Sequence, residues 1–157
     1  EVLEGIISTR RRGEAPRPTW SMSADELQRV FAVMDRVFLP RPVSRYIARV
    51  TASTHPTGPE APDEVSRYVS YGASPRAAIA MAEASRAHAL IAGRPTVGFE
   101  DVKAVAAAVL NHRVLLNYQA RFDKVDSYAV VAALLDRLDE AGVDLPGDIE
   151  METGATG

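Results

Sequence analysis

The residues best suited to chemistry lie in the segment Gly72-Ala73-Ser74-Pro75-Arg76-Ala77. Ser74 followed by Pro75 is typical of an N-cap and the first residue of a helix. Arg76 then lies on the first turn, beside backbone N–H groups that have no partner within the helix. Because the helix dipole is also positive there, an arginine at this end costs stability unless an anion binds. The segment therefore predicts a phosphate site. A solvent-facing Arg76, or one paired with an acidic side chain, is the open alternative.

Residues for nucleotide or thiol chemistry are missing elsewhere in the chain. The sequence has no cysteine, which excludes disulfides, cysteine-based zinc sites and thiol nucleophiles. Its two lysines, Lys103 and Lys124, do not stand between a glycine and a serine or threonine, so there is no Walker A motif. No acidic pair follows a run of aliphatic residues, as a Walker B strand requires. We expect no catalytic residue in this chain.

The three histidines give no metal site, because His55, His88 and His112 are too far apart in sequence for the i, i+4 spacing of a zinc helix. We interpret each as a surface or structural residue. Ser74 is not the nucleophile of a hydrolase elbow, since Arg76 occupies the position where that motif needs glycine.

Length and composition indicate one globular domain with its own hydrophobic core. The chain has 157 residues, of which 46% are hydrophobic and 25% charged. Its net charge of −3 opposes a broad basic face for nucleic acid. There is neither an apolar run long enough for a membrane span nor a secretory signal pattern. The chain opens on Glu1 without an initiator methionine, and we expect a piece of a longer protein.

Apolar residues recur at a helical period almost throughout. We therefore expect an all-α fold, a compact bundle of about six helices with at most a minor strand pair. Residues 63–71 are ambiguous, and 113–118 fit either a short strand or an irregular turn. The expected helices cover residues 1–12, 23–38, 42–50, 74–92, 99–111 and 127–141.

Two of these helices have well-defined expected faces. Ser23 and Glu26 form a capping box before the second helix. Its apolar face comprises Leu27, Val30, Phe31, Met34, Val37 and Phe38. The longest helix should end at Gly93. Its face comprises Ala78, Ile79, Ala82, Ala89, Leu90 and Ile91.

The segment 72–77 resembles the "GASPRA" motif of MoxR-type AAA+ ATPases, and three further stretches match the same family in order and spacing. The match in order and spacing extends over about residues 1–138. The three further stretches are Pro42-Val43-Ser44-Arg45-Tyr46-Ile47, Gly93-Arg94-Pro95-Thr96-Val97 with Phe99-Glu100-Asp101-Val102, and Val109-Leu110-Asn111-His112-Arg113. Asn111 and Tyr118 depart from the pattern, and the tail after Pro146 matches nothing. Neither departure touches Arg76.

This resemblance implies that the chain is the C-terminal helical lid of such an ATPase. Residues 1–20 would connect to the nucleotide-binding core, 21–145 would form the lid, and 146–157 would be a disordered tail. The core, with its Walker motifs, sensor 1 and arginine finger, would precede Glu1. ATP and Mg²⁺ would be bound mainly by that core, and the isolated chain would bind neither tightly.

The resemblance also assigns roles to individual residues. Arg76 would be the sensor 2 residue, which contacts the γ-phosphate of ATP, with Ser74 and Pro75 shaping its helix end. Val43 and Tyr46 could line the adenine, although a place in the lid core is the favoured interpretation. The resemblance leaves open whether Arg76 contacts a nucleotide bound in its own subunit or in a neighbouring one. His112 and Arg113 are interpreted as tethers of a helix end.

For the whole protein, the resemblance implies a cytoplasmic, chaperone-like ATPase that remodels or matures its partners. Its lid would contact its own core and neighbouring subunits of a hexamer, and its partners would carry von Willebrand factor A domains. Two alternatives stay open. One is a stand-alone helical interaction module. The other is nucleic-acid binding through Arg41, Arg45 and Arg49, which the acidic composition opposes.

Overall fold

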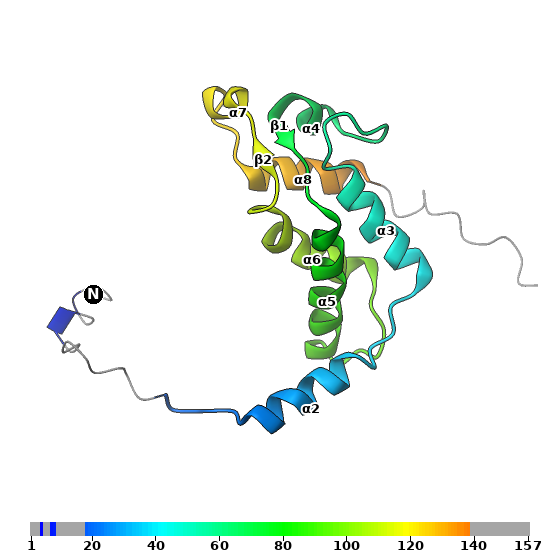
Figure 1. Ribbon diagram of the computed structural model, residues 1–157, viewed down its shortest axis with the longest axis vertical. Helices are drawn as coiled ribbons and strands as arrows, with labels where there is room; N and C mark the ends of the chain where they lie inside the picture. The colour runs from blue at the N-terminus through cyan, green and yellow to red at the C-terminus, as the bar shows by residue number, and fades with distance from the viewer. Residues whose placement is uncertain (1–3, 5–6, 9–17, 139–157) are drawn as a thin grey trace, which may run out of the picture. The chain divides into compact units, whose positions relative to one another are not determined.

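The helices of the chain begin and end largely where local sequence signals place them. The computed structural model in Figure 1 describes residues 4, 7–8 and 18–138. Within this part of the chain it has seven helices and one pair of short strands, which confirms the expected mainly helical bundle. The helices are α2 (Ala24–Met34), α3 (Arg41–Ala52), α4 (Asp63–Tyr68), α5 (Pro75–Ile91), α6 (Phe99–Leu110), α7 (Tyr118–Phe122) and α8 (Ser127–Arg137).

Helix ends follow their predicted caps. Pro42 lies in the first turn of α3, and Ser74 is the N-cap of α5. Gly93 follows the end of α5 with a φ of 71°, the left-handed conformation that favours glycine after a helix. Most of the predicted helix over residues 1–12, the last residues of the helix predicted to reach 141, and the predicted tail lie outside the described residues.

The chain divides into two units, Glu1–Ala32 and Val33–Gly157. The first holds most of α2, whose N-terminus has the predicted capping box. The Ser23 N–H and hydroxyl donate to Glu26 Oε2 at 2.8 and 2.7 Å, and the Glu26 N–H donates to Ser23 Oγ at 3.2 Å. The predicted boundaries after residues 20 and 145 stay predictions.

The prediction that this helix runs to Phe38 is wrong, because α2 ends at Met34. In the second unit, Phe38 is extended and forms a parallel bridge with Thr96. The Phe38 N–H donates to the Pro95 carbonyl, and the Val97 N–H donates to the Phe38 carbonyl, both at 2.9 Å. A bridge to a segment nearly sixty residues away thus replaces the last turn of the predicted helix.

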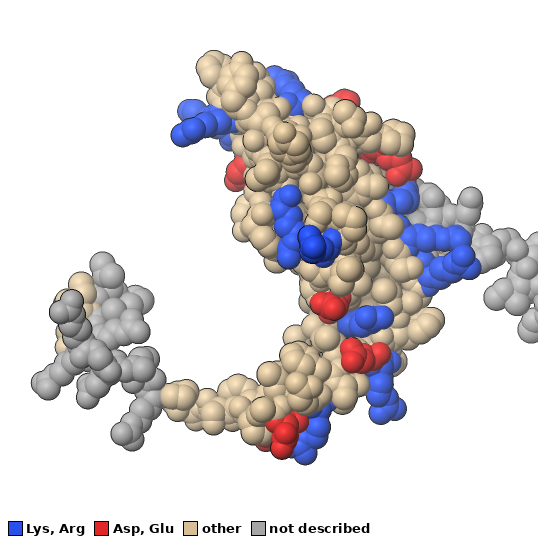
Figure 2. Space-filling model, viewed as in Figure 1, with Lys and Arg blue, Asp and Glu red and all other residues tan. Residues whose placement is uncertain are grey.

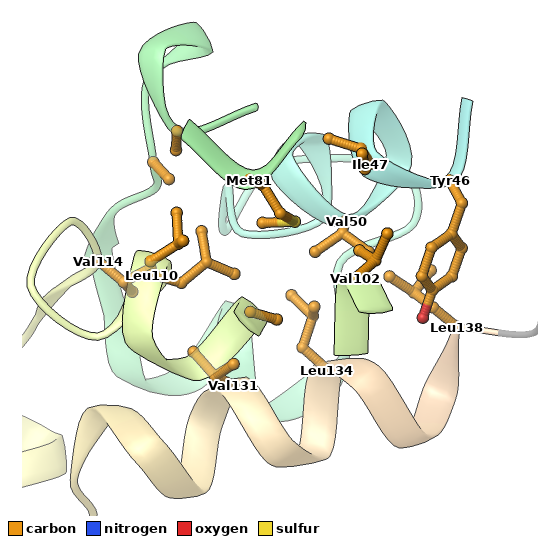
Figure 3. Close-up of a cluster of buried hydrophobic side chains, with 14 of the residues drawn as sticks. Tyr46, Ile47, Val50, Met81, Val102, Leu110, Val114, Val131, Leu134 and Leu138 are labelled. Carbon is orange, nitrogen blue, oxygen red and sulfur yellow. The ribbon is translucent and has the colours of Figure 1, made fainter. Parts of the chain in front are cut away.

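The core of the second unit lies between α3, α5, α6 and α8, with α5 packed against both α3 and α6. Figure 3 shows Val50, Met81, Val102 and Leu134 pointing toward one another from these four helices. Tyr46 of α3 is also buried, and its ring meets Phe99 edge-on at 5.4 Å between centroids. Burial of this set supplies most of the driving force for folding.

The predicted face of the longest helix is confirmed for Ala89, and Ala78, Ala82 and Leu90 are partly buried against the core, but it is wrong for Ile79 and Ile91. Helix α5 buries Ala77, Met81, Ser85 and Ala89, of which only Ala89 was predicted. Ile79 and Ile91 are 61% and 87% exposed instead. The sides of an alanine-rich helix differ little in hydrophobicity, so packing against neighbouring helices determines which side is buried.

The strand pair joins two segments far apart in sequence. Strands β1 (Val69–Tyr71) and β2 (Leu115–Leu116) are antiparallel, with Val69 opposite Leu116 and Tyr71 opposite Leu115. Helix α7 follows β2 directly and was not predicted. None of the helices in the described ranges has the length and apolarity needed to cross a bilayer.

Candidate functional site: the N-terminus of helix α5

The loop that leads into α5 is held against the end of α3 at Gly72. A Cβ atom at Gly72 would lie 2.7 Å from the carbonyl oxygen of Thr54 and 2.8 Å from Cγ of His55. Real Cβ atoms do not approach backbone that closely, so only glycine fits without a shift of the chain. Gly72 therefore permits a close backbone approach, with the segment that follows α3 as its neighbour.

Ala73 is fixed by hydrogen bonds on both sides of its peptide unit. Its N–H donates to Thr54 Oγ1 at 2.8 Å, and the same hydroxyl donates to the Thr51 carbonyl at 2.6 Å. The Ala73 carbonyl lies 3.0 Å from His55 Nε2, which donates to it. Thr54 and Ala73 are both buried. These contacts make the entry into α5 a pre-organised turn.

Sequence reasoning missed Thr54 and gave His55 no specific partner. Both lie 18–19 residues before Ala73 and carry no spacing signal toward it. Only the packing of the α3 end against the loop brings them together. His55 is the structural histidine that we expected, although its role is to hold the candidate site.

The first turn of α5 presents an unneutralised positive end. Ser74 is at the N-cap position with extended backbone, but its hydroxyl makes no capping hydrogen bond. The first turn contains no acidic residue, and Arg76 is exposed. Within the described part of the chain, Arg76 has no ion-pair partner. An exposed hydroxyl and an exposed guanidinium thus lie at the positive end of one helix dipole, a combination that suits an anion such as phosphate.

Val43 and Tyr46 do not lie on this surface. Both side chains are buried in the core of the second unit. The interpretation as lid core accounts for them in this structure, and a contact with adenine stays a prediction.

The Gly93–Val102 stretch closes the turn between α5 and α6 with an ion pair whose carboxylate is buried. Asp101, which has no exposed surface, accepts two hydrogen bonds from Arg94, one from Nη1 at 2.8 Å and one from Nη2. It also accepts the Gly98 N–H at 2.8 Å and His88 Nδ1 at 2.6 Å. Burial raises the pKa of Asp101, but these donors outweigh it and lower the pKa to about 2. This network of hydrogen bonds stabilises the C-terminal end of α5, the helix that has Arg76 at its N-terminal end.

The 109–113 stretch tethers the end of α6, as expected. Arg113 Nη1 donates to the Val109 carbonyl at 2.5 Å, and Asn111 Nδ2 donates to the Tyr128 hydroxyl at 2.6 Å. His112 Nδ1 lies 3.0 Å from Asn111 Oδ1. No cluster of three or more His, Cys, Asp or Glu side chains able to hold a metal occurs among the described residues.

Comparisons with known proteins identify similar domains. The model of the AAA lid domain family matches residues 63–134, which run from α4 into α8. The chain is 31% identical over 120 residues to the chaperone MoxR1 of Mycobacterium tuberculosis, an alignment that covers 76% of this chain and 32% of MoxR1. It is 30% identical over 122 residues to the uncharacterized protein YeaC of Bacillus subtilis, covering 71% of this chain and 35% of YeaC.

A crystal structure of a candidate ATPase from Cytophaga hutchinsonii has the same fold, with a TM-score of 0.70 and 27% sequence identity. The match covers 73% of this chain and 35% of that structure. The chain therefore spans about a third of the length of the curated relatives that it matches.

Proposed function

This chain contains the AAA lid domain of a MoxR-like AAA+ ATPase, and from that premise we propose that Arg76 is its sensor 2 residue, contacting the γ-phosphate of ATP. One observation carries the proposal. Arg76 is exposed on the first turn of α5, and neither that turn nor any ion pair within the described residues neutralises it. A guanidinium held at a positive helix end is suited to bind a negatively charged group.

The γ-phosphate gives this contact a mechanical consequence. Arg76 would bind the phosphate before hydrolysis and lose it afterwards. Because only one nucleotide state offers the contact, the contact biases the orientation of the lid between states. The turn pinned by Thr54 and His55 would transmit this bias to α3 rather than absorb it.

ATP and Mg²⁺ would be held mainly by a nucleotide-binding core, since this chain has no Walker motif. Ser74 and Pro75 would shape the helix end at the phosphate, and Val43 and Tyr46 would belong to the lid core. AAA+ membership supports an oligomeric assembly, for which we propose a hexamer in which Arg76 serves the same or a neighbouring subunit.

For the whole protein we propose chaperone-like remodelling or maturation of partners that carry von Willebrand factor A domains, in the cytoplasm. The name of the relative MoxR1 as a chaperone supports the remodelling activity. The partner class rests on the family resemblance. A stand-alone interaction module remains the alternative, and it differs in needing no nucleotide for partner binding.

The test replaces Arg76 in the full-length parent ATPase. Arg76→Ala should lower ATP turnover by roughly tenfold to a hundredfold, the equivalent of one hydrogen bond to a charged group of about 1.5–3 kcal/mol. Arg41→Ala is the matched control, because Arg41 is also an exposed arginine on the first turn of a long helix. Both variants should melt at the wild-type temperature. Unchanged turnover in Arg76→Ala would remove the sensor role.

A further inference from the structure

Large apolar side chains gather on the surface around the strand pair and α7. Four of them are Tyr71, Leu115, Tyr118 and Phe122, with exposed fractions of 71%, 59%, 80% and 78%, and we call this set the aromatic surface. Tyr71 and Leu115 are directly opposite in the β1–β2 pair, so they project from the same face. Tyr118 and Phe122 are four residues apart on α7 and share one side of that helix. A group of exposed apolar side chains of this kind marks an interaction site more often than scattered ones do.

The backbone beneath the aromatic surface is firmly held. Asp123 accepts hydrogen bonds from Arg67 Nη2 at 2.9 Å, from the Tyr68 hydroxyl at 3.1 Å and from Gln119 Nε2 at 3.1 Å. Asn117 Nδ2 donates to the Arg67 carbonyl at 2.7 Å, and the Asn117 N–H donates to the Tyr68 carbonyl at 2.8 Å. These bonds tie α4, β2 and α7 together. A partner would therefore meet a pre-organised surface and pay little ordering entropy.

The charge around this surface is opposite in sign to that of the chain. Segment 113–124, which holds β2 and α7, carries three basic residues and one acidic residue, a net charge of +2 in a chain whose total is −3. The one acidic residue, Asp123, is already engaged by Arg67. The next one, Asp126, accepts the Ala129 N–H as the N-cap of α8. Figure 2 shows basic side chains on both sides of the largely uncharged lobe formed by α7, at the upper left.

We propose that the aromatic surface binds an acidic polypeptide segment of a partner protein, which places an aromatic or aliphatic side chain against Tyr118 and Phe122. The exposed Arg121 and Lys124 beside them have no ion-pair partner within the described residues and would face the acidic side chains. Tyrosine and arginine are the residue types that most often dominate binding energy at protein interfaces. This proposal rests on residues other than Arg76 and does not depend on the sensor role of Arg76.

Peptide is favoured over nucleic acid by the number and reach of the positive charges. Tight nucleic-acid binding rests on roughly six to ten phosphate contacts. Here Arg121 and Lys124 are the basic residues of α7 and its end, and Arg67 is occupied by Asp123.

The test measures binding of a fluorescent peptide, Glu-Glu-Phe-Glu-Glu-Phe-Glu-Glu, to the 157-residue chain and to the full-length parent by fluorescence anisotropy. Two control probes are the same peptide with serine in place of phenylalanine and an oligothymidylate of twenty nucleotides. Phe122→Ser and Arg121→Glu probe the surface. Ile91→Ser is the matched control, because Ile91 is 87% exposed at the opposite end of α5 from the candidate site.

The proposal expects the acidic phenylalanine peptide to bind both proteins, with each surface variant weakening it at least tenfold and Ile91→Ser leaving it within twofold. The serine peptide should bind at least tenfold more weakly. Three results would overturn it. These are no binding to the chain, equal binding of the oligothymidylate in competition with the peptide, and binding to the chain but not to the parent. The last would show that the parent's own core covers the aromatic surface.

Discussion

The buried carboxylate of Asp101 permits a quantitative prediction about stability and pH. Asp101 has no exposed surface and accepts hydrogen bonds from Arg94, His88 and the Gly98 N–H. Asp101→Asn keeps the shape of the side chain but removes its charge. It also turns an NH₂ group toward donors, so that at least one buried hydrogen bond is lost.

The magnitude follows from the pKa of Asp101, which falls from 3.8 to about 2. Each unit corresponds to about 1.4 kcal/mol, so the charged form contributes about 2 kcal/mol to the free energy of unfolding. Because the folded pKa is the lower one, this stability is fully present above the unfolded pKa near 4 and is lost as the pH falls toward 2. Arg94 is one-third exposed and keeps Glu100 as an ion-pair partner at 2.9 Å, so the loss of the Asp101 charge leaves it only partly unpaired. We expect Asp101→Asn to lose about 2–4 kcal/mol at pH 7.

Urea unfolding followed by circular dichroism, at pH values from 7 to 2, measures this loss. The difference between wild type and Asp101→Asn should shrink by about 2 kcal/mol between pH 5 and pH 2. Glu60→Gln is the matched control, because its ion pair with Arg49 at 3.1 Å is half exposed and should contribute about 0–1 kcal/mol. The stabilising role of the Asp101 carboxylate is refuted if the free energy of unfolding of Asp101→Asn lies within 0.5 kcal/mol of wild type at pH 7. It is also refuted if the difference does not change with pH.

Further perturbations address the loop that carries Arg76. Gly72→Ala would push a Cβ into the Thr54 backbone, and we expect a loss of about 1–3 kcal/mol in urea unfolding. A wild-type midpoint would show that the loop can move away. Thr54→Val removes the acceptor of the buried Ala73 N–H and should cost about 1–3 kcal/mol. In the parent ATPase it should also lower turnover, whereas Thr57→Val, on the exposed loop after α3, should change neither. Turnover that survives Thr54→Val while stability falls would separate the turn from the sensor role.

Much of the fold could be read from local sequence signals. Ser23 with Glu26, Pro42, Ser74 with Pro75, and Gly93 mark helix ends in the structure as they do in the sequence. Each signal acts within a few residues, because caps and turns satisfy backbone groups of the same helix end. The position of Arg76 on the first turn of a long helix is of this kind, and so was available before any tertiary contact was known.

The sequence could not show what depends on distant partners. The extended Phe38 needs Thr96, the Gly72 turn needs Thr54 and His55, and the β1–β2 pair joins residues more than forty apart. Such contacts produce no periodic pattern in the sequence, because each of them depends on how two distant segments pack together.

The side of a helix that faces the core was likewise decided by tertiary packing. Helix α5 is rich in alanine, so its sides differ little in hydrophobicity, and the observed side follows from where α3 and α6 lie. The same packing buries Asp101 and leaves Tyr118 and Phe122 exposed. The sequence alone thus determined the long helices and where they begin, but not the short helices α4 and α7. The tertiary structure decided which side chains are buried, which form the site at α5 and which remain on the surface, because burial is a property of neighbours rather than of a residue.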